Sequence, residues 1–565
     1  MTKLQDWWWV TEDSNRFTRP GSGYRIEGET IQSRVWDMIE NAENHLKNEA
    51  ISKGKDPLFF SGYKEKMYAY AARGFYSFAT PEWSNFGRDT GLPISCNGVY
   101  IEDSVDSILD KVKEVGIQTK HGAGTSAAFD ALRPRGTKIS DGGVADGPAH
   151  FAALFEACVD TIRQSSRRGA MCVSLPVDHP DIMEWLQFRD EGAIVKQLSF
   201  AVSIPDWWMD EMIQEDSNNP NKKIIWARII QKRYKDGYPY IFYSDNVNNY
   251  APATYRGKYK IHASNLCHEI CLPSSTDWSF SCCLASMNAL LYDEWKDTDA
   301  VECLVYFLEA VLLEYIEKAR KIKGMEPSVK FAEENRAIGI GTLGLHSLFQ
   351  SKRLPFISEE ANRLDLELHS RLADKAEIAS RKLAVVLGEC KVTEGTGRRH
   401  ATLTAIAPTT SSAFILGGVS QSIEPENANY YIKDLAKGKF TVQNKYLKED
   451  LEQLGLDTPE VWDSIKKRGG SVQHLDIPAH TKEVYKTFGE INQVELIVRA
   501  AARQKFIEQS QSFNIMVHPA TNPKDVSEMM ILGWNLGIKT FYYQRSTNPA
   551  QMLIRELAVC TACEA

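Results

Sequence analysis

Two segments that lie far apart in the chain carry cysteines in patterns that suit redox chemistry. Cys560 and Cys563 form a C-x-x-C motif in the last residues, where few packed neighbours are expected, so they predict a mobile dithiol rather than a structural disulfide. Cys267 is flanked by Asn265 and Glu269, two residues to either side. In a strand or an extended loop, residues two apart point the same way, so these three side chains could meet one substrate. Together the segments predict an enzyme that oxidises internal thiols in each turnover and re-reduces them with its own tail.

Two further cysteines lie in segments that could contribute to the same chemistry. Cys96 lies in GLPISCNGVYIEDSVDSI, and Cys282 lies in SFSCCLASMNAL. Cysteine is among the most buried residue types, so each of them taken alone is more often a structural residue than a reactive one. The residues by themselves leave both interpretations open.

A run of hydroxyl side chains precedes an apolar segment in APTTSSAF. It consists of Thr409, Thr410, Ser411 and Ser412. Hydroxyls and free amides at the start of a helix form an anion site, but the same groups also cap a helix. An anion site and a simple helix cap are therefore both compatible with the run.

Two adjacent tyrosines, Tyr542 and Tyr543, lie near the end of the chain. Adjacent aromatic residues usually belong to a hydrophobic core. Paired phenols are also what a stepwise radical relay requires, and this hypothesis stays beside the structural one.

Two motifs are weaker than they look. Gly339, Gly341 and Gly344 spell G-x-G-x-x-G, but a dinucleotide site needs a strand before the motif, and the preceding SVKFAEENR is charged and typical of a helix. We therefore expect these glycines to serve close packing of backbones. The run CHEIC around Cys267 has no second Cys or His pair at a zinc-site spacing nearby, so no metal site is predicted.

The elements that must position these residues follow from the periodicity of the sequence. Helix-forming residues with helical apolar spacing fill 32–73, and 301–321 has the pattern of an amphipathic helix. Between 95 and 196, short β-rich runs alternate with helical ones, and GIKTFYYQRS is a further β-rich run. This alternation predicts an α/β fold with largely parallel strands. Periodicity is lost near Thr547, where we place the start of a tail.

Composition bounds the class of protein. The 565 residues are 43% hydrophobic and 25% charged, as in a large globular enzyme, and the net charge of −8 with no long basic run gives no sign of direct nucleic-acid binding. No segment has the roughly 18 consecutive apolar residues of a membrane span, and no signal peptide is evident. The 11 cysteines are odd in number and scattered, which favours catalytic thiols in a reducing cytoplasm.

From about Pro93 onward the chain resembles the large, catalytic subunit of a class I ribonucleotide reductase. Six motifs occur in the family's order: the SC before VYIEDSVDSI, SNLCHEI, SCCLASMN, PTTSS with GGVSQSIEP, KTFYYQRS and the C-terminal dithiol. The resemblance implies a ten-stranded α/β barrel, built from two five-stranded halves, with an internal finger loop. It further implies a helical region without an ATP cone at 1–90, the barrel at 91–546 and a flexible redox tail at 547–565.

The resemblance also implies roles for individual residues. A thiyl radical on Cys267 would remove the 3′ hydrogen of a ribose, Glu269 would accept the 3′ hydroxyl proton, and Asn265 would orient both. Cys96 would supply reducing equivalents with a second thiol; alignment on CLAS favours Cys282, and Cys283 stays open as the alternative. The remaining implied sites are the shuttle Cys560 and Cys563, the radical-transfer pair Tyr542 and Tyr543, the substrate residues Ser95 and Thr409 to Ser412, and the effector residues Asp103, Ser104 and Arg133.

The partners implied by the resemblance are a radical-generating small (beta) subunit, a thioredoxin or glutaredoxin-type reductant, and ribonucleoside diphosphates as substrates. Deoxynucleoside triphosphates or ATP would act as effectors at a specificity site, and no cofactor would be bound in this chain. A homodimer is compatible with the resemblance, and the sequence leaves the oligomeric state open. Two alternatives remain. An adenosylcobalamin-dependent (class II) reductase shares the cysteines without needing the tyrosine pair. A thiol–disulfide oxidoreductase normally carries its C-x-x-C at a helix start near a βαβ unit, not in the last residues.

Overall fold

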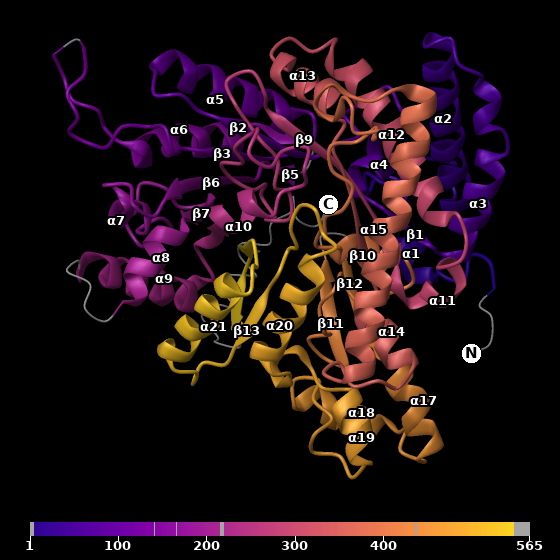
Figure 1. The fold of residues 1–565 in the computed structure, drawn as a ribbon. Coiled ribbons are helices and arrows are strands. Elements are labelled where there is room, and N and C mark those ends of the chain that lie inside the picture. The colour runs from indigo at the N-terminus through magenta and orange to yellow at the C-terminus, as the bar shows by residue number, and fades with distance from the viewer. Residues whose placement is uncertain (1–4, 141, 165–166, 215–219, 436–437, 547–565) are drawn as a thin grey trace.

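The computed structural model describes residues 5–546, apart from 141, 165–166, 215–219 and 436–437. At its centre lies a nine-stranded sheet in the order β1-β9-β2-β3-β6-β7-β8-β14, with β10 paired to β9 (Figure 1). The strands are β1 (Tyr76–Phe78), β2 (Cys96–Tyr100), β3 (Gly124–Ala128), β6 (Met171–Pro176), β7 (Ser199–Ile204), β8 (Tyr240–Tyr243), β9 (Phe280–Asn288), β10 (Ile338–Leu343) and β14 (Thr540–Phe541).

The first half of this sheet is a parallel array. β2, β3, β6, β7 and β8 pair in parallel, each with the next along the chain. Parallel neighbours need crossover connections, and α5 (Val105–Lys120), α6 (Pro148–Thr161) and α9 (Pro220–Asp236) provide helices between them. The inner strands are buried along almost their whole length, as expected for strands covered on both faces. The predicted alternation of strands and helices is therefore present.

The second half runs antiparallel to the first and closes a ring. β9 pairs antiparallel with β2, β10 lies parallel to β9, and parallel bridges then join Ile340 to Thr404 and Ile406 to Gln511. The segment that continues into β13 (Ile515–Val517) pairs with β15 (Gln544–Ser546), and the preceding β14 pairs antiparallel with β8. Five extended segments thus lie in each half, which confirms the ten-stranded α/β barrel. The two antiparallel junctions, β2 with β9 and β8 with β14, are called the thiol seam and the phenol seam below.

Helices of the N-terminal region pack with later helices beside the second half of the barrel, where α12 contacts β9 and β10. α2 (Ile31–Ser52) and α3 (Tyr63–Arg73) pack on α12 (Ala300–Ala319), which also contacts α15 (Glu359–Leu387). The predicted helix is present as α12, but the prediction that one of its faces is polar is wrong, because 16 of its 20 residues are buried. Helices and β9 surround α12, so apolar residues are needed on all its sides and its few charged residues do not mark a solvent-exposed face.

The glycines of the G-x-G-x-x-G motif serve the barrel wall. α13 (Glu326–Asn335) precedes them, and Gly339 and Gly341 lie within β10 itself. A Cβ atom on Gly341 would lie 2.5 Å from the carbonyl oxygen of Ala405, so only glycine lets the two backbones approach so closely. The interpretation as close backbone packing fits this geometry.

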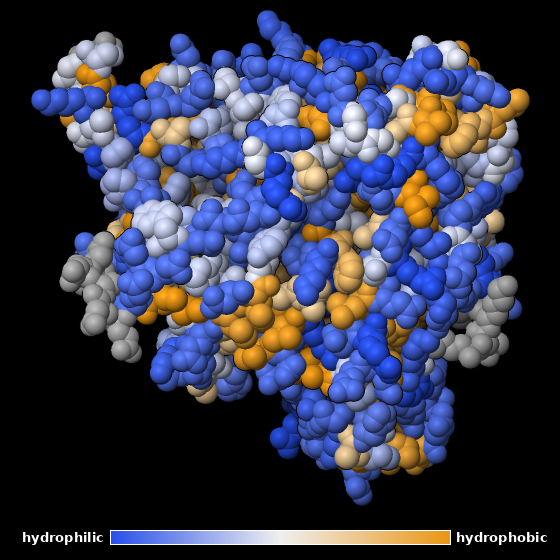
Figure 2. Space-filling model, viewed as in Figure 1, coloured by the Kyte–Doolittle hydropathy of each residue, from blue (hydrophilic) through white to orange (hydrophobic). Residues whose placement is uncertain are grey.

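The surface in the view of Figure 2 is mostly hydrophilic, with apolar side chains gathered around α20 (Gln493–Gln504) and α21 (Pro523–Asn535). Among the described residues, no helix combines the length and apolar character needed to cross a membrane. The remaining helices are α1 (Glu12–Phe17), α4 (Thr80–Asn85), α7 (Ile182–Trp185), α8 (Asp206–Ile213), α10 (Ser244–Asn249), α11 (Tyr292–Trp295), α14 (Leu345–Ser351), α16 (Thr410–Ile415), α17 (Lys445–Gln453), α18 (Pro459–Lys467), α19 (Ala479–Val484), α20 (Gln493–Gln504) and α21 (Pro523–Asn535), and the remaining strands are β4 (Arg163–Gln164), β5 (Arg167–Arg168), β11 (Tyr430–Leu435) and β12 (Gly438–Gln443).

Candidate active site

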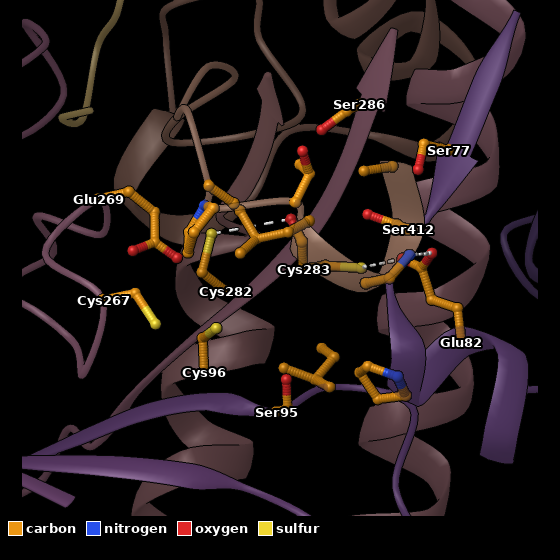
Figure 3. Close-up of a pocket in the computed structure, with 18 of the residues that line it drawn as sticks. Ser77, Glu82, Ser95, Cys96, Cys267, Glu269, Cys282, Cys283, Ser286 and Ser412 are labelled. Carbon is orange, nitrogen blue, oxygen red and sulfur yellow. Dashed lines mark hydrogen bonds between the residues drawn. The ribbon is translucent and has the colours of Figure 1, made fainter. Parts of the chain in front are cut away.

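The thiol seam places Cys96 directly opposite Cys282. The two residues are Cα partners in the antiparallel register of β2 and β9, so their side chains lie on the same face of the sheet. Figure 3 shows their sulfur atoms at one end of a pocket, together with Cys267 and Glu269. Adjacent residues of a strand point to opposite faces, so Cys283 points away from Cys96, although it also lines this pocket. Its thiol instead lies 3.8 Å from Oε1 of the buried Glu82.

The finger loop that carries Cys267 is a tight turn rather than an extended segment. Its ends are joined by an antiparallel bridge between Ser264 and Cys271, and His268 adopts a left-handed conformation with φ of 64°. Oδ1 of Asn265 accepts hydrogen bonds from the backbone N–H groups of Glu269 and Ile270, both at 3.1 Å. Simple two-residue alternation therefore does not bring the three side chains together, because Asn265 builds the turn from inside. Its buried Nδ2 lies near Glu269 and Cys96 but makes no hydrogen bond of standard geometry within the described chain.

The wall of the barrel fixes the loop from the side opposite the thiol seam. The hydroxyl of Ser512 donates to the carbonyl of Cys267 and, at 3.2 Å, to Oε2 of Glu269. Thr540 donates from Oγ1 to the carbonyl of His268 at 2.8 Å. Because these donors belong to barrel strands, the position of the reactive thiol is tied to the fold.

One buried amide connects the loop to the thiol seam. Oε1 of Gln509 accepts from the backbone N–H of Cys271 at 3.2 Å, and its Nε2 lies 3.4 Å from Sγ of Cys282. Neither Gln509 nor Ser512 was predicted from the sequence. The only signal in the sequence was the run of hydrogen-bonding residues in EQSQS, which is not specific enough to predict contacts with the loop.

Burial sets the protonation of the groups in the pocket. Glu269 is almost fully buried, and this burial raises its pKa to about 7, although the nearby donors of its own backbone, Asn265 and Ser512 partly offset the rise. Burial also raises the pKa of Cys282 to about 12 and the pKa of Cys96 well above its usual value. A carboxyl with a pKa near neutrality can accept and return a proton, while both thiols keep their hydrogens at neutral pH.

The pocket extends from the thiols toward the start of α16. Ser95, Thr409 and Ser412 line it, as predicted for the substrate residues. Thr410 and Ser411 are not among its lining residues, and Oγ1 of Thr410 donates to Gln421 at 2.9 Å. Thr409 occupies the N-cap position of α16 without a side-chain cap bond, since its hydroxyl accepts from the backbone of Ser422. The cap interpretation therefore does not account for the Thr409 hydroxyl.

The phenol seam holds the tyrosine pair in an aromatic cluster. The ring centroids of Tyr542 and Tyr543 are 4.3 Å apart, and the ring of Tyr240 lies 4.7 Å from Tyr542. His268 of the finger loop packs 4.8 Å from Tyr240. Neither Tyr240 nor its neighbour Tyr238 was predicted from the sequence. Their tyrosine-rich run YPYIFY was visible in the sequence, but only the strand pairing shows that it faces the tyrosine pair.

The three predicted effector residues lie together outside this pocket. Ser104 is the N-cap of α5, where its side chain accepts from the backbone N–H of Ser107. Nε of Arg133 lies 2.6 Å from Oδ2 of Asp103, and both side chains are about one-third exposed. Arg133 is therefore paired with a carboxylate in this structure. The predicted shuttle Cys560 and Cys563 lie outside the described residues.

A family model described as "Ribonucleotide reductase, barrel domain" matches residues 94–220, 211–396 and 391–544. The structure of the Actinobacillus ureae class Id ribonucleotide reductase alpha subunit superposes with a TM-score of 0.89 at 42% identity, covering 97% of this chain and 99% of that one.

Two viral relatives cover most of the chain. The ribonucleoside-diphosphate reductase large subunit of Invertebrate iridescent virus 3 is 30% identical over 85% of this chain and 87% of its own length. The relative from Frog virus 3 (isolate Goorha), whose name assigns it to the same kind of subunit, is 34% identical over 91% of this chain and 94% of its own.

Proposed function

The chain belongs to the ribonucleotide reductase family, and from this membership we infer that it is the large, catalytic subunit of a ribonucleoside-diphosphate reductase. Such an enzyme replaces the 2′ hydroxyl of a ribonucleotide by hydrogen. The observation that carries the proposal is the meeting of two elements at one pocket. Cys96 faces Cys282 across the thiol seam, and the finger loop brings Cys267 and Glu269 to the same end.

The chemistry assigned to these residues needs a radical, because the carbon–oxygen bond at C2′ is not broken by acid–base catalysis alone. A thiyl radical on Cys267 takes the 3′ hydrogen, and Glu269 accepts the proton of the 3′ hydroxyl. The 2′ hydroxyl leaves as water with a proton from Cys96 or Cys282. The two thiols supply one hydrogen to the leaving water and one to C2′, lose two electrons in all and become a disulfide. Glu269 returns its proton to the 3′ oxygen, and Cys267 returns its hydrogen to C3′, which restores the thiyl radical. A pKa of about 7 for Glu269 suits a group that must accept and release a proton at neutral pH.

The remaining roles extend outward from the pocket. Thr409 and Ser412 are proposed to hold the diphosphate, with Ser95 beside the ribose and the buried Nδ2 of Asn265 toward a ribose oxygen. Tyr542 and Tyr543 would pass an oxidising equivalent from a radical-generating beta subunit to Cys267. Cys560 and Cys563 would then reduce the internal disulfide and be reduced in turn by a thioredoxin or glutaredoxin-type protein.

The regulatory assignment is also a proposal. A deoxynucleoside triphosphate near Ser104 would compete with Asp103 for the guanidinium of Arg133, since an arginine fork binds phosphate as well as carboxylate. Effector binding then requires the Asp103–Arg133 pair to open. The N-terminal helical region at 1–90, the barrel at 91–546 and the tail at 547–565 are proposed as the functional divisions.

The test is an activity assay with defined radical sources. We expect the wild type to reduce ribonucleoside diphosphates with a class I beta subunit and not with adenosylcobalamin alone. Cys267→Ser should lose all turnover while still binding the diphosphate, because a serine hydroxyl does not form the required radical under these conditions. Cys158→Ser is a matched control, since this half-buried thiol of α6 only donates to the carbonyl of Val112.

Two outcomes would contradict the assignment. Substantial turnover by Cys267→Ser would remove the central role of that thiol. Turnover of the wild type with adenosylcobalamin alone would replace the class I assignment by the class II alternative.

A further inference from the structure

Four tyrosine rings form one connected cluster at the phenol seam, and two of them lie outside the pair of Tyr542 and Tyr543. Tyr240 begins β8 and Tyr238 precedes it, while Tyr542 and Tyr543 follow β14. Ring centroids are 4.9 Å apart between Tyr238 and Tyr240, and 5.0 Å apart between Tyr240 and Tyr543. The cluster is therefore continuous from one strand to the other.

Tyr238 makes a direct phenol-to-phenol contact with Tyr543. The two hydroxyl oxygens are 3.1 Å apart, either of them can be the donor, and the rings meet edge to face with centroids 5.5 Å apart. At this separation a single hydrogen bond joins the two oxygens. A hydrogen atom can then pass between the two oxygens without any movement of the backbone, because the O–H bond that breaks and the O–H bond that forms both lie between these oxygens.

The surroundings keep Tyr238 in its neutral, hydrogen-bearing form. Its side chain is 5% exposed, and this burial raises its pKa above the ordinary value for tyrosine. The hydroxyl of Ser199 lies 3.2 Å away as a second hydrogen-bonding neighbour. A phenol that keeps its proton can take part in transfer of an electron and a proton together.

A cation is held over the ring of Tyr238. The guanidinium carbon of Arg189 lies 4.7 Å from the ring centroid, and its NH1 group donates to the carbonyl of Gln197 at 2.8 Å. Arg189 has a φ of 68°, a left-handed conformation that is uncommon for residues other than glycine. A positive charge on the ring face opposes the loss of an electron alone. The stacked arginine therefore favours a neutral transfer in which the proton leaves with the electron.

Tyr243, at the end of β8, shows what a purely structural phenol looks like. Tyr243 is fully buried, and its hydroxyl donates to the carbonyl of Met530 at 2.9 Å. That bond satisfies the hydroxyl with a backbone group that has no redox chemistry. The hydroxyl of Tyr238 is directed instead at another phenol.

We propose that Tyr238 is a third radical-carrying phenol that exchanges a hydrogen atom reversibly with Tyr543. The proposal rests on the proposed function, in which a beta subunit supplies the oxidising equivalent. In the exchange, the O–H bond of Tyr543 breaks, its hydrogen atom joins the oxygen of a Tyr238 radical, and the unpaired electron moves to Tyr543. The reverse step restores the starting state, so atoms and electrons balance without any further reactant.

The direct test places an easily oxidised tyrosine analogue in the cluster. The full chain with 3-aminotyrosine at 238, at 543 or at 243 is mixed with the beta subunit, substrate and effector, and its radicals are identified by electron paramagnetic resonance. We expect an aminotyrosyl radical at 238 and at 543, and none at 243. A radical at 543 without one at 238 would overturn the inference and leave the proposed function standing. Absence of radicals at 238 and at 543, in a complex without reductase activity, would reject the proposed function and the inference with it.

A substitution gives an independent readout. Tyr238→Phe keeps the ring under Arg189 and removes only the hydroxyl, so we expect kcat to fall by about tenfold or more with an unchanged KM for the diphosphate. Tyr243→Phe, the control at the end of β8, should keep a kcat close to that of the wild type. A kcat of Tyr238→Phe within about twofold of the wild type, at normal affinity for the beta subunit, would count against a radical on Tyr238.

Discussion

The two seams of the barrel use the same architecture for different chemistry. At the thiol seam, the antiparallel register of β2 and β9 sets Cys96 opposite Cys282. At the phenol seam, Thr540 pairs with Phe242 and Phe541 with Ile241, and continuing this register by one residue sets Tyr542 opposite Tyr240. In both cases a residue of one half of the barrel meets a residue of the other half. The finger loop lies between the seams, with Cys267 toward the thiols and His268 toward the phenols.

The seams differ in the space beside them. The thiol seam opens on a pocket whose lining includes Ser95, Thr409 and Ser412. The phenol seam is filled by rings in contact, and Tyr240 and Tyr542 are almost completely buried. Bond breaking on a substrate needs a pocket that admits the substrate. Electron and proton transfer between side chains instead needs those side chains to pack in direct contact. In the proposed function, the same kind of strand junction serves as a reaction site in one place and as a contact for radical transfer in the other.

The largest effect is expected at the phenol seam. Tyr542→Phe keeps the ring that packs against Tyr240 and Tyr543 but removes the phenolic hydrogen. Because no oxidising equivalent would then reach Cys267, even the first turnover with the beta subunit should be lost. Rapid-quench measurement of product in a single turnover checks this, with thermal stability and diphosphate affinity as controls that should stay near the wild-type values. Normal product formation would mean that contact at this seam is structural only.

A loss of steady-state turnover that no added reductant restores is expected at the thiol seam. Cys282→Ser should fail to sustain turnover with either a thioredoxin-type reductant or dithiothreitol, because no disulfide can form with Cys96. Cys283→Ser is the matched control, one residue along the same strand and on its opposite face, and should keep activity within about threefold of the wild type. The measurement is steady-state product formation under both reductants. A damaging Cys283→Ser with a silent Cys282→Ser would shift the redox pair by one residue.

These seams also show what the sequence could and could not predict. Strand–helix alternation and six ordered motifs were enough for the barrel and for the residues around Cys267. Neighbouring cysteines at 282 and 283 look alike in sequence, and only the pairing of β9 with β2 separates their faces. The turn of the finger loop was not predicted, because it depends on the side chain of Asn265. This side chain accepts hydrogen bonds from the backbone N–H groups of Glu269 and Ile270 within the loop. Tyr238 was overlooked for a related reason, since its partner Tyr543 lies more than 300 positions away.

The smallest effect is expected where the barrel wall contacts the catalytic base between the seams. The Ser512 hydroxyl donates to Glu269 at 3.2 Å, and a donor to a carboxylate stabilises its charged form and holds its pKa down. Ser512→Ala should therefore raise the pKa of Glu269 above its value of about 7, by roughly half a unit to one unit for the loss of one such bond. Since the base must be ionised to accept the 3′ hydroxyl proton, the rising limb of kcat against pH should move upward by the same amount.

Activity of Ser512→Ala should consequently be lowered near pH 7 and approach the wild-type rate about two units above the shifted pKa. Ser510→Ala is the matched control, because its hydroxyl bonds to Oγ1 of Thr540 and only its backbone N–H, which alanine keeps, contacts Glu269. Its pH profile should coincide with that of the wild type. If Ser512→Ala instead loses the same fraction of kcat at every pH, the serine acts through its bond to the carbonyl of Cys267. The barrel wall would then position the thiol of the finger loop without tuning the base beside it.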